Sequence, residues 1–148
     1  MLQNLALLLL LLGYVYVTIT DIKSRIIPDR AVLTMLIPAA VLAYQIGIKT
    51  ALIAAITGGL FFFIMAVLSK GGVGGGDIKL VTVTGLALGP GLIITLLITF
   101  ILGMAGGFIG LIMKRDSYFK AQIPLAPYLT AGVFVNVAIK LLMKGGLS

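Results

Sequence analysis

Acidic side chains are scarce in this 148-residue chain, which contains four Asp residues and no Glu. Asp21 ends the first apolar stretch, and Asp77 closes the glycine-rich run 71–76. A carboxylate at the edge of a membrane segment is costly and usually serves chemistry. Two carboxylates that share one site cannot both ionise easily, so one of them keeps a proton. The ionised partner can take a proton from water while the neutral partner polarises a carbonyl. The two residues therefore predict the acid–base chemistry of an aspartic protease.

Each carboxylate also has a purely structural interpretation. Asp77 could cap the helix that follows it, because Asp is favoured at helix N-caps. Asp21 could pair with Lys23 or Arg25, which are close to it in the sequence. The residue types alone leave both interpretations open.

Two absences narrow the chemistry that the chain could perform. It contains no Cys, so disulfides, Cys-ligated zinc and a thiol nucleophile are excluded. It also contains no His, which removes imidazole acid–base chemistry and most transition-metal sites. Asp, Lys, Tyr, Ser and Thr remain as catalytic groups, and we expect neither a metal nor a cofactor.

The composition is that of a polytopic membrane protein, with 61% hydrophobic residues, 10% charged residues and a mean hydropathy of +1.24. Ordinary soluble domains average about 45–50% and about 25% in these two classes. We expect one membrane-embedded domain over residues 1–148. Residues 1–20 are typical of a transmembrane helix rather than a signal peptide, because no basic segment precedes them and no small-x-small cleavage site follows.

Apolar runs long enough to cross a bilayer, about 20 residues, predict an all-α fold of six transmembrane helices. The expected spans are residues 1–20, 31–48, 51–68, 78–88, 92–113 and 125–143. The fourth span is short, begins at or near Asp77, and is not expected to cross the membrane alone. We expect a tight turn at Lys49 and Thr50, and a glycine-rich loop over residues 69–76.

The distribution of basic residues favours one orientation in the cytoplasmic membrane. The loops after the first, third and fifth spans, with their flanks, hold Lys23, Arg25, Arg30, Lys70, Lys79, Lys114, Arg115 and Lys120, whereas the other side holds Lys49, Lys140 and Lys144. The positive-inside rule then places both termini outside and all four Asp residues on the cytoplasmic side. Basic loops and anionic membrane lipid explain the net charge of +7, so we expect no nucleic-acid partner.

Three glycines, Gly74, Gly75 and Gly76, directly precede Asp77. Because glycine has no Cβ and tolerates positive φ, they permit a substrate backbone to approach closely and the chain to turn sharply into the next helix. The structural alternative is that these glycines form a flexible linker. A phosphate-binding loop would need Lys and Ser or Thr after the glycines, and Asp77 occupies that place instead.

Three motifs resemble those of the type IV prepilin peptidases, a family of Gly-x-Gly-Asp intramembrane aspartyl proteases. Residues 74–77 match Gly-x-Gly-Asp, with Lys79 two positions later, where that family often has Lys. Residues 21–29 look like its first-Asp segment, an Asp followed by basic residues and Ile-Pro-Asn, with Asp29 in place of Asn. Residues 123–129 resemble Ile-Pro-Phe-Gly-Pro-x-Leu, with Leu125 and Ala126 replacing Phe and Gly. Presenilin and signal peptide peptidase share Gly-x-Gly-Asp but lack the first-Asp pattern.

The resemblance implies that Asp21 and Asp77 are catalytic. It implies cleavage of the short basic leader from type IV prepilin-like or archaellin-like precursors at the cytoplasmic face, with membrane lipid as the surroundings. Bifunctional members of the family carry an N-terminal region that N-methylates the new terminus, often with a four-Cys zinc site. This sequence shows neither, so we expect a peptidase-only form.

Other motif residues are candidates for substrate approach or for shaping the site. They are Lys23, Pro28, Asp29, Lys79, Pro124 and Pro127. Lys79 could tune the pKa of Asp77, hold substrate or simply mark topology, and Asp29 could bind the basic leader or be a turn residue. Asp116 is expected to be a solvated loop charge. A small transporter and a structural subunit of a pilus or secretion machine remain alternatives, and a homo-oligomer is an open possibility for the assembly.

Overall fold

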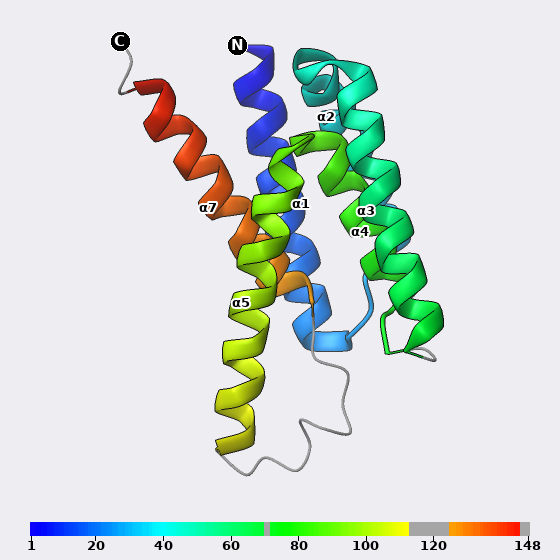
Figure 1. The fold of residues 1–148 in the computed structure, drawn as a ribbon. Coiled ribbons are helices and arrows are strands. Elements are labelled where there is room, and N and C mark those ends of the chain that lie inside the picture. Colours follow the sequence, from blue (N-terminus) through cyan, green and yellow to red (C-terminus); the bar gives the residue numbers. More distant parts are fainter. Residues whose placement is uncertain (70–71, 113–124, 146–148) are drawn as a thin grey trace.

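A computed structural model describes residues 1–69, 72–112 and 125–145, and these residues form helices and connecting turns without any strand (Figure 1). The helices are α1 (Leu2–Ser24), α2 (Asp29–Ile46), α3 (Ile48–Leu68), α4 (Gly75–Leu88), α5 (Gly91–Ile112) and α7 (Ala126–Gly145). The predicted all-α fold with six helices is therefore confirmed.

Five of the helices, all except α4, are long and apolar enough to cross a membrane. Helix α4 has 14 residues, a length of about 21 Å at about 1.5 Å per residue. The hydrocarbon core of a bilayer is about 30 Å thick, so α4 is too short to cross it alone. The prediction of a multi-pass membrane protein with a short fourth helix is confirmed.

Three predicted boundaries are wrong. Helix α1 continues through Asp21 to Ser24, because nothing at Asp21 breaks the helix. The turn between α2 and α3 is at Gly47, whose φ of 102° suits glycine, and not at Lys49 and Thr50, which belong to α3. Gly75 and Gly76 belong to the first turn of α4 rather than to the loop before it.

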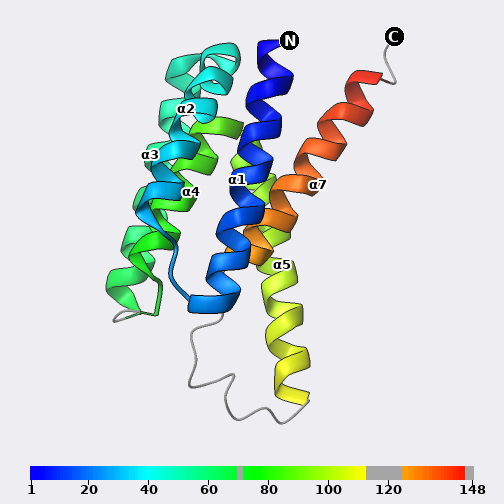
Figure 2. The same ribbon diagram turned by 180° about the vertical axis from the view of Figure 1, so that it is seen from behind.

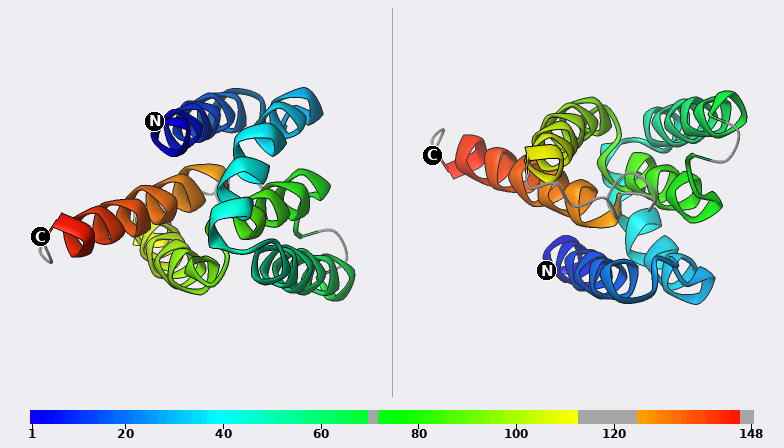
Figure 3. Two further views of the ribbon diagram at one scale, coloured as in Figure 1. Left: turned by 90° about the horizontal axis from the view of Figure 1, so that it is seen from above. Right: turned by 90° about the horizontal axis from the view of Figure 1, so that it is seen from below.

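Helix α4 forms the centre of one half of the molecule. It packs against α2 and α3, whereas α1 lies between α2 and α7, and α5 packs mainly on α7 (Figures 2 and 3). The outer faces of the long helices expose large apolar side chains, including Leu60, Phe61, Phe63 and Ile64 of α3. Such a surface suits contact with lipid rather than water.

Glycines allow α3 and α4 to approach closely. A Cβ added to Gly85 of α4 would lie 2.7 Å from the Ala54 carbonyl oxygen and 2.7 Å from the Ala55 Cα. Gly58 of α3 likewise faces Val81 of α4. Lipid supplies little hydrophobic drive for helix association, so close contact through small residues stabilises such pairs. Helix α4, which carries Asp77, is thereby held firmly on α3.

The N-terminus and the end of α7 lie at the same end of the bundle (Figure 1). The end of α1 and the start of α4 lie at the opposite end. The two predicted catalytic residues are therefore at the same end of the molecule.

Candidate active site

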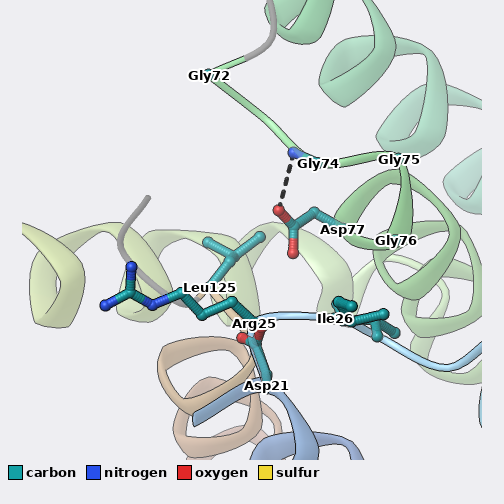
Figure 4. Close-up of a pocket in the computed structure, with 10 residues that line it drawn as sticks. Asp21, Arg25, Ile26, Gly72, Gly74, Gly75, Gly76, Asp77 and Leu125 are labelled. Carbon is teal, nitrogen blue, oxygen red and sulfur yellow. Dashed lines mark hydrogen bonds between the residues drawn. The ribbon is translucent and has the colours of Figure 1, made fainter. Parts of the chain in front are cut away.

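A cavity of about 200 Å³ opens at the end of the bundle where α1 finishes and α4 begins (Figure 4). Parts of all three sequence motifs surround it. Its lining consists of Asp21, Arg25, Ile26, Ile27, Gly72, Gly74, Gly75, Gly76, Asp77 and Leu125. The two carboxylates that the sequence singled out therefore share one cavity.

Asp21 lies in the last turns of α1 with 5% of its surface exposed. Its Oδ2 accepts a hydrogen bond of 3.1 Å from the backbone N–H of Ala126. Ala126 is the first residue of α7, so its N–H is one of those that the helix leaves without an internal partner. The third motif thus holds the Asp21 carboxylate in place through its backbone.

Asp21 forms no ion pair with Lys23 or Arg25; within the described ranges, the one salt bridge joins Lys79 and Asp29. Lys23 lies outside the cavity lining, whereas the Arg25 side chain contributes to it. The structural interpretation of Asp21 as a partner of these basic residues is not borne out.

Asp77 is the third residue of α4, and its Oδ2 accepts a hydrogen bond of 3.2 Å from the Gly74 N–H. The N-cap is Gly74, so Asp77 is not the N-cap residue itself, although it does satisfy an N–H at the helix start. Burial raises the pKa of Asp77 to about 6; the Gly74 hydrogen bond opposes that rise, and the charge of Asp21 adds to it. A carboxyl with such a pKa can hold or release a proton near neutral pH.

The carboxyl groups of Asp21 and Asp77 face the cavity from different helices, and no hydrogen bond joins them (Figure 4). The two helices do not pack side by side, because α2 lies against both α1 and α4, whose own backbones are not closely packed. The space between the carboxyls is the cavity itself, which is large enough for several water molecules, each needing about 30 Å³.

The N-terminal ends of α4 and α7 converge on this cavity, since Gly75 begins one helix and Ala126 the other. Helix N-termini carry partial positive charge and unpaired N–H groups, which stabilise nearby negative charge. Each of the two carboxylates is hydrogen-bonded at one of these ends. The arrangement favours ionisation of at least one of the two carboxylates.

Gly76 has a packing role in addition to lining the cavity. A Cβ at this position would lie 2.8 Å from the Cβ of Ile27. Ile27 belongs to the segment that follows Asp21, so the absence of a side chain at Gly76 lets the first and second motifs meet. A Cβ at Gly75, in contrast, would meet nothing within 4 Å.

Asp29 and Lys79 lie outside the cavity lining and bind each other. The Lys79 Nζ is 2.7 Å from the Asp29 Oδ1, and the two side chains are 65% exposed for Asp29 and 54% exposed for Lys79. The pair joins the start of α2 to α4. No hydrogen bond or salt bridge joins either side chain to Asp77 among the described residues, and the rise in the pKa of Asp77 has other causes.

Two of the candidate prolines lie at element boundaries. Pro28 is the N-cap residue of α2, and Pro127 is the second residue of α7. Pro124 and Asp116 lie outside the described residues. No group of three or more potential metal ligands occurs among the residues that the structure describes.

Two contributors to the site were not anticipated. The Ala126 N–H was missed because a backbone donor leaves no trace in residue type, although the flanking prolines 124 and 127 hinted at a helix start there. Arg25 was considered as an ion-pair partner and as a basic residue of a cytoplasmic loop, and not as part of the cavity lining. It ends α1 in the left-handed conformation, with φ 54° and ψ 31°, which directs the chain toward Ile26 and Ile27 along the cavity.

Comparison with known proteins bears on the function of this cavity. The model of the type IV leader peptidase family matches residues 7–111. The chain is also 33% identical over 126 residues to the prepilin leader peptidase/N-methyltransferase of Bacillus subtilis (strain 168), covering 80% of this chain and 49% of that protein. The chain thus spans about half the length of the curated relative that it matches. No solved structure matches it.

Proposed function

The chain belongs to the type IV leader peptidase family, and from this premise we propose that it is a membrane aspartyl endopeptidase. It removes the short basic leader from type IV prepilin-like or archaellin-like precursors, with Asp21 and Asp77 as the catalytic pair and water as the nucleophile. The observation that carries the proposal is that these two carboxyls, from different helices, line one cavity. The motif resemblance to this family is confirmed by the family match.

In this mechanism the two carboxyls carry one proton between them. The ionised carboxyl takes a proton from a water molecule in the cavity, and the water oxygen attacks the scissile carbonyl carbon. The protonated carboxyl donates a hydrogen bond to the carbonyl oxygen as negative charge develops there. Collapse of the tetrahedral intermediate breaks the C–N bond, and the leaving amine takes a proton from the pair. One water is consumed, and an acid and an amine are released.

The position of the cavity supports a substrate that enters from the membrane surface. The cavity is lined by residues from the last turns of α1 and the start of α4, which lie at one end of the bundle rather than midway along the spans. A precursor with a hydrophobic helix can remain in the lipid while its leader junction reaches the two carboxylates. The basic leader complements the negative charge of the pair.

The basic residues support a cytoplasmic location for this end. Lys23, Arg25, Arg30 and Lys79 are all at the cavity end of the bundle, whereas Lys49 and Lys140 are at the other end. The positive-inside rule then orients the cavity to the cytoplasm and both termini to the outside.

The test is leader cleavage in membranes. A tagged prepilin is co-expressed with the wild type, Asp21→Asn, Asp77→Asn or the control Asp29→Asn, and the shift from precursor to mature form is read on a gel. Asp29→Asn removes a carboxylate at the same end of the bundle but outside the cavity.

We expect cleavage by the wild type and Asp29→Asn, and none by the other two variants at equal expression. Cleavage that survives either cavity substitution would refute the aspartyl mechanism. If the wild type leaves a panel of prepilin leaders uncleaved, the proposed activity is wrong.

A further inference from the structure

A buried hydrogen bond joins α1 to α4 deep in the bundle. The hydroxyl of Tyr14 is 2.6 Å from the Oγ1 of Thr84, and both side chains are fully buried. No other side-chain hydrogen bond between these two helices occurs among the described residues. The bond is notable because the backbones of α1 and α4 are not closely packed, so the long Tyr14 side chain spans the distance.

Tyr14 and Thr84 are each the same number of residues from the carboxylate on their own helix. Tyr14 precedes Asp21 by seven residues on α1, and Thr84 follows Asp77 by seven residues on α4. Seven residues are nearly two helical turns, or about 10.5 Å, so each pair lies on one face of its helix. The two helices run in opposite directions (Figure 1). The Tyr14–Thr84 layer is therefore directly above the Asp21–Asp77 layer in both helices.

The direction of the hydrogen bond follows from the neighbours of Thr84. Its Oγ1 donates to the Leu80 carbonyl at 2.7 Å. A Thr hydroxyl has one proton to donate, so the Tyr14 O–H is the donor to Thr84. Replacing Tyr14 by Phe then removes one bond and leaves no buried donor unpaired, whereas replacing Thr84 by Val orphans the buried Tyr14 hydroxyl.

Tyr14 also connects α1 to α7. Thr130 of α7 donates to the Tyr14 carbonyl at 3.4 Å, and its Oγ1 is 2.7 Å from that of Thr18. Helix α7 in turn supplies the Ala126 N–H that holds Asp21. In lipid, where apolar side chains gain little from meeting each other, such interhelical hydrogen bonds help to specify how helices align.

We propose that Tyr14 and Thr84 are positioning residues, whose hydrogen bond sets the register of α1 against α4 and thereby the separation of the Asp21 and Asp77 carboxyls. The inference rests on the proposed function, because it assigns these residues a role in cleavage. Neither residue is part of the cavity lining. Loss of the bond allows α1 and α4 to shift relative to each other, and a displacement of about 1 Å in a catalytic site can cost about 100-fold in rate.

The catalytic part of the test compares initial rates of leader release by the purified full chain in lipid nanodiscs. For Tyr14→Phe and Thr84→Val we expect kcat to fall about tenfold or more, with KM unchanged. Thr84→Ser keeps the acceptor and should restore the wild-type kcat. Tyr16→Phe is the matched control, because it removes the same hydroxyl from an exposed position of α1.

The structural part does not depend on activity. Because the chain has no native Cys, spin labels at Ser24→Cys and Gly75→Cys report only the separation of the two helix ends. Both positions are exposed, and Gly75 has open space around its Cβ. We expect Tyr14→Phe to broaden or shift this distance distribution and Tyr16→Phe to leave it unchanged.

The two parts separate the proposals. An unchanged distance distribution in Tyr14→Phe overturns the positioning role, whatever the rates are. A changed distribution with wild-type kcat overturns it as well, because the register would then not matter to catalysis. If Asp21→Asn cleaves as fast as the wild type, the proposed function fails instead, while the distance measurement still decides whether this bond sets the register.

Discussion

At the residue scale, the candidate site consists of two carboxyls from different helices that line one cavity. Asp21 is held by a backbone N–H of α7, and Asp77 by the N–H at the start of its own helix. Burial keeps the pKa of Asp77 near 6, and the Asp21 charge contributes to that rise. A pair of this kind has apparent pKa values that belong to the pair rather than to either residue.

The raised pKa predicts how cleavage depends on pH. The pair must keep one proton, and a raised pKa means that this proton is retained up to a higher pH than in an ordinary carboxyl. As pH rises through about 6 the last proton is lost, so kcat/KM should fall on the alkaline side with a midpoint near 6. Bound substrate displaces water and disfavours the second charge further, so the corresponding midpoint in kcat should be higher.

The measurement is the rate of leader release by purified protein from pH 4 to 9. A profile in which kcat/KM stays constant between pH 5 and 8 would contradict a proton shared between the carboxyls. Asp29→Asn serves as the control, because it should leave both midpoints in place.

At the element scale, the position of Asp77 depends on how closely α4 approaches α3. A single Cβ at Gly85 would collide with the backbone of α3 at Ala54 and Ala55, which cannot rotate away. Overpacking of this kind costs about 1–3 kcal/mol. We predict that Gly85→Ala lowers the thermal unfolding midpoint in detergent, whereas Gly75→Ala, whose Cβ meets nothing within 4 Å, does not. Equal midpoints for the two variants would show that the α3–α4 contact is looser than described.

The helix pattern was largely predictable from the sequence, because long apolar runs and Gly or Pro breaks are local signals. The turn at Gly47 was missed because the polar pair Lys49 and Thr50 gave a stronger signal than one glycine. Of the candidate site, the sequence predicted the two Asp residues, Asp21 and Asp77, because their residue type is rare in this chain. The Ala126 N–H and the Tyr14–Thr84 hydrogen bond were not predictable, because both depend on the packing of helices that are distant in the sequence. The first contact also involves a backbone group, and the second involves side chains that are common in membrane spans.

At the scale of the whole molecule, the proposed leader cleavage requires the cavity end to face the cytoplasm. The chain has no Cys, so single Cys substitutions can report the side of the membrane. Ser24 is at the cavity end and Lys49 at the other end, and both are exposed. In intact cells we predict that an impermeant maleimide labels Lys49→Cys, and that Ser24→Cys reacts only after the membrane is permeabilised. The reverse pattern would place the cavity on the outside and exclude cytoplasmic cleavage.

The claim that Asp21 and Asp77 act as one catalytic unit is tested most directly by the cleavage rates of Asp21→Asn, Asp77→Asn and the double variant. All three are purified, and leader release from one precursor is measured under single-turnover conditions. Residues that act as a unit are strongly non-additive, so either substitution alone should cost about as much as both together, on the order of 1,000-fold or more. If the losses instead multiply in the double variant, or if one single variant keeps most of its rate, the two carboxyls do not form a catalytic pair.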